Sequence, residues 1–548
     1  MLGKCIYSTI SKKCVSLSFI QQRGLIRPRK TREYFDVVRA VMDNSTVKSL
    51  NDWKNVRNSI LEHSYNSGKY TKNNIDALII NYCANKKDCD LGTSYLNFLK
   101  KENIEPNLAT IGKYLKLLYT INADMVFKEG KKLPVIEEEL ILRYKSGSAE
   151  NIRSHGLVHF NRYYEDLRRD YPVLDSYSLE NAILALSVTS KWRTCLDLLK
   201  DIEATATPNN LCYSSSIAAA FINKEEELGW AMLEEMLQCE RIPNSYAFHG
   251  YLSRLRRHRS KRLIIEKLEM LFLFLQKYDM KCPEDVIKNI ADLADGLKLL
   301  NIFTTVSFKG ICQNCQSRMT NFELTPNEFA ELKGAVLENV IVGKNVFSKT
   351  DPDELERFKK FVTNMGTFDV VLDGLNVAYS AGTKNSPVVH SGLVAAVVSH
   401  FVENRRRVLV LGRKHMNKWP KQNWGYVNEN ATVFLTQNIS QDDPYLLYCA
   451  LQSGQNTVIV TRDLMRSHRF LLESPNLKKN FNRWLNQRQW QLVRVDEQRG
   501  PIFRKPPPFT VTTQKANGLW HIPYEQNKVN EKDQYIDTWL CLKTTQFT

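Results

Sequence analysis

The sequence predicts a multidomain α and α/β protein: an N-terminal helical solenoid, a central zinc-binding region and a C-terminal α/β domain. Three observations support this fold class. Prolines recur at a near-constant interval through a long helical stretch, a Cys-x-x-Cys motif follows it, and short β-branched runs then alternate with helix-like segments. The 548 residues leave room for three or four domains of roughly 100–200 residues each.

Composition excludes several classes of protein. Hydrophobic residues make up 43% of the chain and charged residues 25%, which is too apolar for a disordered protein. The longest apolar runs, Met270–Leu275 and Leu393–Val398, are far shorter than the roughly 18 residues of a membrane span. Twelve cysteines are too few for a disulfide scaffold. The net charge of +17 indicates a polyanionic partner, and nucleic acid fits best.

The N-terminal segment reads as a targeting signal. The stretch from Met1 to Arg32 contains no acidic residue but eight basic ones, interleaved with Ser, Thr and apolar residues. This composition is typical of a mitochondrial presequence, so residues 1–40 are predicted to direct the protein to the mitochondrial matrix, with an open cleavage point. A basic arm that binds nucleic acid is the alternative. Without these eight charges the net charge of +17 falls to +9, so the argument for a polyanionic partner holds.

Residues 70–300 are predicted to form an array of helix pairs. Apolar residues recur three or four apart, and the prolines at positions 172, 208, 243 and 283 follow one another at a near-constant interval. A period of roughly 35 residues, with a proline in the closing loop, indicates a helical solenoid. The interval from Pro106 to Pro172 is nearly twice as long, which indicates a degenerate or interrupted repeat.

Parts of this array resemble pentatricopeptide repeats. Lys101–Asn107 resembles the end of such a repeat, and Leu233–Leu237 with Arg241–Asn244 resembles its second helix and terminator. The resemblance implies an RNA ligand for residues 70–300, whereas a helical array that binds protein is the alternative. A basic cluster favours contacts to RNA phosphates, although such a run can also be a solvated helix face; its members are Arg254, Arg256, Arg257, Arg259, Lys261 and Arg262.

A Cys-x-x-Cys motif, Cys312 and Cys315, follows the array. Its spacing lets both sulfurs reach one tetrahedral zinc ion. A redox role would require a thioredoxin-like strand before the motif and a helix opening at it, and the sequence has neither. The motif is half a site, and its completion must come from far along the chain. His521 and Cys541 are the candidates, although each taken singly fits better as a packing residue beside tryptophan.

The segment between residues 368 and 495 has the pattern of a parallel sheet covered on both faces, because strand-like runs alternate with helix-like segments such as Ser391–Asn404 and Pro444–Gln452. In such sheets, ligands bind at the carboxyl ends of the strands. The predicted strands are Phe368–Leu372, Val408–Leu411, Thr432–Leu435, Thr457–Val460 and Gln491–Val495.

Four aspartates are predicted to meet at this carboxyl edge. Asp373 and Asp463 close the first and fourth runs, and Asp442 and Asp443 precede Pro444 at the start of a predicted helix. Each alone fits a turn or a helix cap. Together, however, four carboxylates would repel one another in a partly desolvated cleft. Mg²⁺ or Mn²⁺ removes this conflict, and Mg²⁺ keeps coordination positions open for a phosphate substrate.

The order of these segments resembles the protein-only RNase P family, including its animal mitochondrial members. The resemblance is densest in Val370–Ala378, Ser440–Pro444, Val460–Arg466, Trp520–Tyr524 and Trp539–Cys541. It implies a PIN-like (NYN-type) metallonuclease domain at residues 367–500 and a zinc-binding central domain made of residues 301–366 and 501–548. It also implies that Asp373, Asp442, Asp443 and Asp463 are catalytic and bind Mg²⁺ (or Mn²⁺), and that Cys312, Cys315, His521 and Cys541 bind structural Zn²⁺.

The family resemblance further implies an activity and partners. Its members remove 5′ leaders from precursor tRNAs, so an endoribonuclease with ribonuclease P activity is expected. Its animal mitochondrial members imply two protein partners, a tRNA purine-9 methyltransferase subunit and a short-chain dehydrogenase-like subunit. The alternatives are a non-catalytic pentatricopeptide RNA-binding factor and a PIN-like nuclease acting on other RNAs. Four acids at strand and helix ends argue against the first alternative, because a protein that only binds RNA has no need of negative charge facing it.

Overall fold

The chain divides into two compact units in the computed structural model. Unit 1 comprises Met1–Leu268 and Pro283–Lys298, and unit 2 comprises Glu269–Cys282 and Leu299–Thr548. The residues that the structure describes are 30–45, 49–62, 70–131, 169, 174–341, 352–437, 443–463, 465, 469, 471–472, 474–525 and 538–544. Residues 1–29 of the predicted presequence lie outside them. In the described part, no helix has both the length and the hydrophobicity to cross a membrane.

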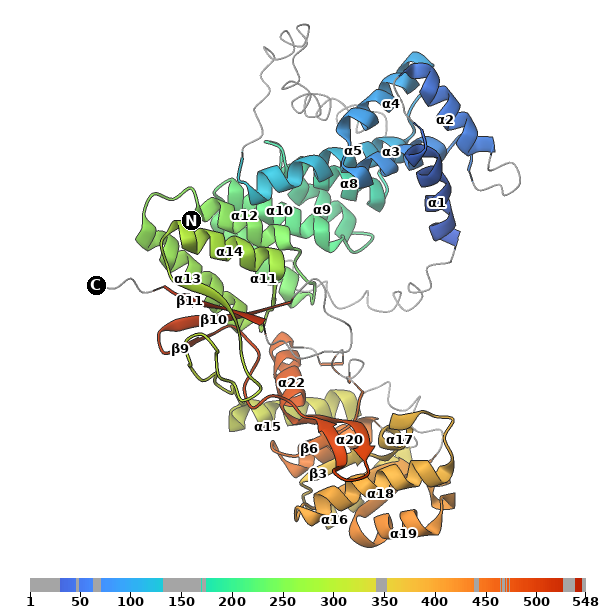
Figure 1. Cartoon of the computed structure of the whole chain (residues 1–548), viewed down its shortest axis with the longest axis vertical. Coiled ribbons are helices and arrows are strands. Elements are labelled where there is room, and N and C mark those ends of the chain that lie inside the picture. The colour runs from blue at the N-terminus through green and yellow to red at the C-terminus, as the bar shows by residue number, and fades with distance from the viewer. Residues whose placement is uncertain are drawn as a thin grey trace. The chain divides into compact units, whose positions relative to one another are not determined.

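Unit 1 is built from helices, which confirms the helical part of the predicted fold class (Figure 1). α13 (Lys261–Lys277) begins in unit 1 and continues into unit 2. Most of the predicted interruption between Pro106 and Pro172 lies outside the described residues. The other helices are α1 (Lys30–Asp43), α2 (Leu50–Glu62), α3 (Ile75–Lys86), α4 (Cys89–Lys101), α5 (Leu108–Ala123), the π-helical turn η2 (Asp124–Lys128), α8 (Ser176–Ser187), α9 (Thr194–Glu203), α10 (Asn210–Ile222), α11 (Glu226–Gln238), α12 (Ser245–Leu255) and α14 (Glu284–Gly296).

The Pro-Asn pairs of the sequence set where these helices begin. Asn107, Asn209 and Asn244 are N-cap residues, and each side chain accepts a hydrogen bond from a backbone N–H in the first turn of its helix. Asp175 caps α8 in the same way. The preceding proline lacks an N–H and cannot extend a helix, whereas the asparagine satisfies a donor that the next helix leaves unpaired. The repeating pair therefore separates successive helices.

Helices α10 and α12 pack closely because α12 carries a glycine at the contact. A Cβ added at Gly250 would lie 2.6 Å from Cα and 2.8 Å from the carbonyl oxygen of Ala218 in α10. Both are main-chain atoms, so a side-chain rotation cannot relieve the clash. The close approach of these two helices therefore depends on glycine at position 250.

We expect Gly250→Ala to lower the free energy of unfolding of unit 1 by about 1–3 kcal/mol, because the helices must separate to admit the methyl group. Chemical denaturation would measure the change. Gly296→Ala is the matched control, since no heavy atom lies within 4 Å of the added Cβ in α14 and alanine favours a helix. Equal stability of Gly250→Ala and the wild type would contradict the argument.

Unit 2 contains a six-stranded sheet in the order β5-β4-β3-β6-β7-β8. All neighbours from β5 to β7 are parallel, and β8 is antiparallel to β7. The five runs predicted as strands all form strands, so the α/β part of the fold class is confirmed, and β8 is a strand that the sequence did not reveal. The strands are β3 (Val370–Asp373), β4 (Val408–Arg413), β5 (Thr432–Thr436), β6 (Val458–Val460), β7 (Gln489–Asp496) and β8 (Gly500–Arg504).

Alternate strand residues of this sheet face two different hydrophobic cores. Val371 and Ile459 belong to the core covered by α16 (Pro352–Met365), α20 (Asp443–Ser453) and α22 (Pro475–Arg488). Their strand neighbours Val370, Leu372 and Val460 belong to the opposite core, which is covered by α17 (Gly374–Ala378), α18 (Pro387–Glu403) and α19 (Lys421–Asn430). The sheet is thus covered on both faces, as near-continuous apolar runs require.

The order in which successive strands are added to this sheet reverses between β3 and β6. Strands β4 and β5 lie on one side of β3, and β6 and β7 lie on the other. Such a switch point opens a crevice at the carboxyl ends of the two central strands. Asp373 is the last residue of β3, and Asp463 follows shortly after the end of β6.

A second sheet in unit 2 joins segments that are far apart in the sequence. Its order is β1-β10-β11-β2, and β9 pairs with β10 as a branch off this path. The strands are β1 (Cys282–Pro283), β2 (Asn301–Thr305), β9 (Gln514–Ala516), β10 (Leu519–Glu525) and β11 (Thr538–Lys543). Glu269 of α13 supports this sheet, since its carboxylate accepts hydrogen bonds from Trp520, Lys515 and Thr544.

Candidate active site and metal centre

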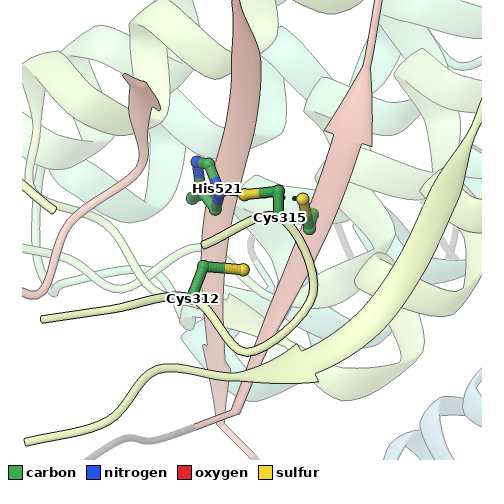
Figure 2. A group of neighbouring side chains, drawn as sticks. Cys312, Cys315 and His521 are labelled. Atoms are coloured by element: carbon green, nitrogen blue, oxygen red, sulfur yellow. Dashed lines mark hydrogen bonds between the residues drawn. The ribbon is translucent and has the colours of Figure 1, made fainter. Parts of the chain in front are cut away.

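The second sheet brings the four predicted zinc ligands together. His521 and Cys541 are direct partners in the antiparallel pairing of β10 with β11, while Cys312 and Cys315 lie in the loop after β2. The ligand atoms of all four residues lie within 4.8 Å of one another. Cys315 Sγ is 3.1 Å and Cys541 Sγ 3.6 Å from Nε2 of His521. Figure 2 shows Cys312, Cys315 and His521 close together, with Cys315 beside the ring of His521.

The backbone turns tightly between the two cysteines of the loop. The N–H of Cys312 donates to the carbonyl of Ser317, and the N–H of Gln316 donates to the carbonyl of Cys312. Gly310 has a φ of +80°, and an added Cβ would lie 2.9 Å from the ring of Phe509, so the loop requires glycine there. These contacts direct both sulfurs of the motif toward β10.

Electrostatics favour a cation at the centre of this group. Cys312, His521 and Cys541 are buried. Burial lowers the pKa of His521 to about 4, so its ring is neutral near pH 7 and has a lone pair to donate. Burial, with the neighbouring Cys312 and Cys315, raises the pKa of Cys541 to about 12. Three thiolates could not be ionised together here without a cation, and three sulfurs with one imidazole nitrogen are a typical donor set for structural zinc. The residues therefore fit a zinc ion.

The candidate active site lies at the switch point of the six-stranded sheet. Asp373 caps α17, and its Oδ1 accepts a hydrogen bond from the N–H of Asn376 at 3.0 Å. Its Oδ2 accepts a hydrogen bond from the hydroxyl of Thr461, also at 3.0 Å. Asp463 is exposed, and its Oδ1 accepts from the N–H of Met465 at 2.6 Å. Asp373 is therefore a helix cap and also lies beside the segment that carries Asp463.

Asp442 and Asp443 are the other two aspartates predicted for this site. Asp442 lies outside the described residues. Asp443 is the first residue of α20, and its side chain is not among those described. Helix α20 packs against β3, the strand that ends at Asp373. The structure thus brings the segments of Asp373 and Asp463 together, and the positions of the Asp442 and Asp443 carboxylates stay predictions.

Residues 306–541 match the model of the protein-only RNase P family. These residues belong to the protein-only RNase P family. A mouse protein named mitochondrial ribonuclease P catalytic subunit is 30% identical over 393 residues, covering 69% of this chain and 66% of the relative. The rat protein of the same name is 29% identical over 390 residues, covering 69% of this chain and 65% of the relative. The chain thus matches just under two thirds of the length of each relative.

Solved structures share the fold of this chain. A crystal structure of nuclear proteinaceous RNase P 2 from Arabidopsis thaliana has a TM-score of 0.54, with 16% identity. The match covers 86% of this chain and 100% of that chain. A second structure of the same Arabidopsis protein has a TM-score of 0.52, with 15% identity and the same coverage. At such low identity, the likeness is evidence for the fold alone.

The candidate active site has supporting residues that the sequence did not single out. Asn376 accepts a hydrogen bond through its side-chain oxygen from the N–H of Arg462 at 2.9 Å. The guanidinium of Arg462 donates to the carbonyls of Leu492 in β7 and of Ser380. Both side chains and Thr461 lie inside the two motifs that carry Asp373 and Asp463. The hydrogen bonds of these three residues depend on which strands lie side by side. The motifs do not encode that arrangement.

Some residues of the basic cluster predicted to contact RNA bond other groups of the protein, and others are exposed. Arg256 donates to the carbonyls of Lys128 and Asn289, and Arg257 donates to the carbonyls of Gly130 and Ile222. Arg262 is exposed and pairs with Glu266 at 2.9 Å. Arg254 is half-buried, and Arg259 and Lys261 are exposed. Half of the cluster therefore makes contacts within the protein, and contact of the six residues with RNA phosphates stays a prediction.

Proposed function

We propose that this protein is a divalent-metal-dependent endoribonuclease that removes the 5′ leader from mitochondrial precursor tRNAs. The observation that carries the proposal is the match of residues 306–541 to the protein-only RNase P family, in a fold that holds Asp373 beside the segment of Asp463. The names of the mouse and rat relatives support ribonuclease P activity and a mitochondrial location. We assign the nuclease chemistry to residues 367–500.

In this proposal Asp373, Asp442, Asp443 and Asp463 hold Mg²⁺ or Mn²⁺. When bound, such an ion would supply an activated water as the nucleophile and positive charge at the leaving oxygen. The chain itself orients the carboxylates: the N–H of Asn376 and the hydroxyl of Thr461 each hold one oxygen of Asp373. The expected products are a tRNA with a 5′-phosphate and a leader with a 3′-hydroxyl.

We assign RNA binding to residues 70–300, as a pentatricopeptide-type array. Contact with tRNA phosphates is proposed for Arg254, Arg259, Lys261 and the 90% exposed Arg262, while Arg256 and Arg257 also bond main-chain carbonyls. Cys312, Cys315, His521 and Cys541 would hold a structural Zn²⁺ that ties residues 301–366 to residues 501–548. The resemblance to animal mitochondrial members makes a tRNA purine-9 methyltransferase subunit and a short-chain dehydrogenase-like subunit the proposed partners.

One experiment tests the activity. The full chain is incubated in Mg²⁺ with a mitochondrial precursor tRNA, with and without the two proposed partner subunits, and the cut is mapped to the nucleotide. A single cut at the first nucleotide of the mature tRNA is expected. RNA binding without cleavage under every condition would favour a non-catalytic RNA-binding factor. Cuts elsewhere, or on unrelated RNAs with equal efficiency, would favour a PIN-like nuclease of another pathway.

The location makes a separate prediction, motivated by the acid-free, basic stretch from Met1 to Arg32. A reporter protein fused after residue 40 is expected to enter mitochondria and to lose its leader, because import signals of this type are removed after entry. Fractionation with immunoblotting would measure both. The control reverses the charge of Arg23, Arg27 and Arg29, which should block import. A full-length reporter in the cytosol or nucleus would contradict the prediction.

A further inference from the structure

The hydroxyl of Thr461 links the two described carboxylate segments of the candidate active site. Thr461 follows the end of β6 and is 1% exposed. Its Oγ1 donates to Oδ2 of Asp373 at 3.0 Å and accepts from the N–H of Asp463 at 3.2 Å. A hydroxyl has one proton, and the short contact to a carboxylate fixes where that proton points. The same oxygen therefore orients one carboxylate and the backbone that carries the other.

The main chain of Thr461 is held by other groups. Its N–H donates to the carbonyl of Trp490, and its carbonyl accepts from the side chain of Gln489 at 2.9 Å. The same Gln489 amide donates to the carbonyl of Asp463 at 2.8 Å. These bonds hold the main chain of Thr461 and Asp463 without help from the Thr461 hydroxyl, so the hydroxyl is left to act on Asp373 and Asp463.

A second threonine at the other end of β6 shows what a purely structural hydroxyl does in this sheet. Thr457 precedes β6, is 3% exposed, and donates to the main-chain carbonyl of Phe368 at 3.1 Å. Thr461 instead donates to a carboxylate at the edge where ligands bind. A hydrogen bond to a charged acceptor is about twice as strong as one between neutral groups, and it restricts the acceptor more.

We propose that Thr461 is a positioning residue that sets the relative placement of Asp373 and Asp463 for divalent metal binding. The role of Thr461 in catalysis rests on the proposed function. Its effect on metal affinity can be measured without RNA. Outer groups that orient metal ligands typically change metal affinity or activity by about 10–100-fold when they are removed. Removing the hydroxyl should therefore weaken metal binding while the fold persists.

The test compares three full-length variants for binding of Mn²⁺ alone, followed by the electron paramagnetic resonance signal of the free ion. Thr461→Val keeps the shape of the side chain and removes the hydroxyl, whereas Thr461→Ser keeps the hydroxyl and removes a methyl group. Thr457→Val removes a buried hydroxyl just before β6, at the end away from the site. Circular dichroism and thermal unfolding establish that each variant is folded. Thr461→Val is expected to fold, because Asp463 is exposed and water can replace the lost hydroxyl as the acceptor for its N–H.

Thr461→Val should weaken Mn²⁺ binding about 10-fold or more, Thr461→Ser should restore it to within about threefold of wild type, and Thr457→Val should leave it unchanged. Unchanged binding in Thr461→Val, or an equal loss in Thr457→Val, would overturn the inference. In cleavage assays, the Mg²⁺ concentration for half-maximal rate should rise in Thr461→Val and recover in Thr461→Ser. If the wild type cuts no precursor tRNA while the Mn²⁺ result holds, the proposed function fails and the inference stands.

Discussion

Asp373→Asn should reduce the rate of precursor tRNA cleavage by about two orders of magnitude or more, in a protein that is still folded. The exchange removes the charge that would hold Mg²⁺, and with it the generation of the nucleophile and the stabilisation of the leaving oxygen. Asparagine is nearly isosteric and is as good an N-cap as aspartate, so the bond from the N–H of Asn376 should persist. Single-turnover cleavage in Mg²⁺ would measure the effect.

Asp369→Asn is the matched control for this variant. Asp369 lies at the opposite end of β3, where its carboxylate accepts from the N–H of Arg407 at 2.9 Å and pairs with Arg406 at 3.5 Å. Its loss should leave the cleavage rate near that of the wild type. Binding of precursor tRNA should persist or tighten in Asp373→Asn, because negative charge facing RNA falls. A wild-type rate in Asp373→Asn would mean that Asp373 is only a helix cap, and joint loss of binding and cleavage would mean that it is structural.

The sequence predicted where the strands of the six-stranded sheet run, but it did not predict which strands are neighbours. β-branched runs ending in Asp373 or followed by Asp463 mark the strand ends, because side-chain type largely decides where a buried strand can run. The order of the strands is set by crossovers that no single run encodes. Thr461 illustrates the limit: it reads as one more β-branched residue, and only the pairing of β3 with β6 brings its hydroxyl to Asp373.

Long-range contacts explain the other gaps between sequence and structure. The spacing of Cys312 and Cys315 predicted half of a metal site, whereas His521 and Cys541 become neighbours only through the register of β10 with β11. Charge density predicted that the basic cluster contacts RNA. Arg257, however, bonds the carbonyl of Gly130, far earlier in the chain, and charge alone cannot distinguish that contact from a phosphate contact.

Cys315→Ser should release one zinc ion per chain and lower the free energy of unfolding of unit 2 by more than about 4 kcal/mol, since loss of a bound metal is among the few causes of so large an effect. The ion would join the loop after β2 to β10 and β11, so its loss removes a link between distant segments. Elemental analysis of the purified protein and thermal unfolding would measure the two effects. A chelator should reproduce the destabilisation in the wild type.

Cys449→Ser separates metal loss from the loss of a buried thiol. Cys449 is buried in α20 of the same unit, where it belongs to a hydrophobic core. Its sulfur lies 3.8 Å from the hydroxyl of Ser453, within hydrogen-bonding distance. This variant should keep its zinc, so any small loss of stability reports packing alone. Cleavage should fall in Cys315→Ser only as far as unit 2 unfolds, because the four predicted zinc ligands gather at the sheet of β10 and β11, whereas Asp373 ends β3 of the other sheet. Absence of zinc from the wild type would refute the site, and an equal melting temperature for Cys315→Ser and Cys449→Ser would reduce the metal to a minor role in folding.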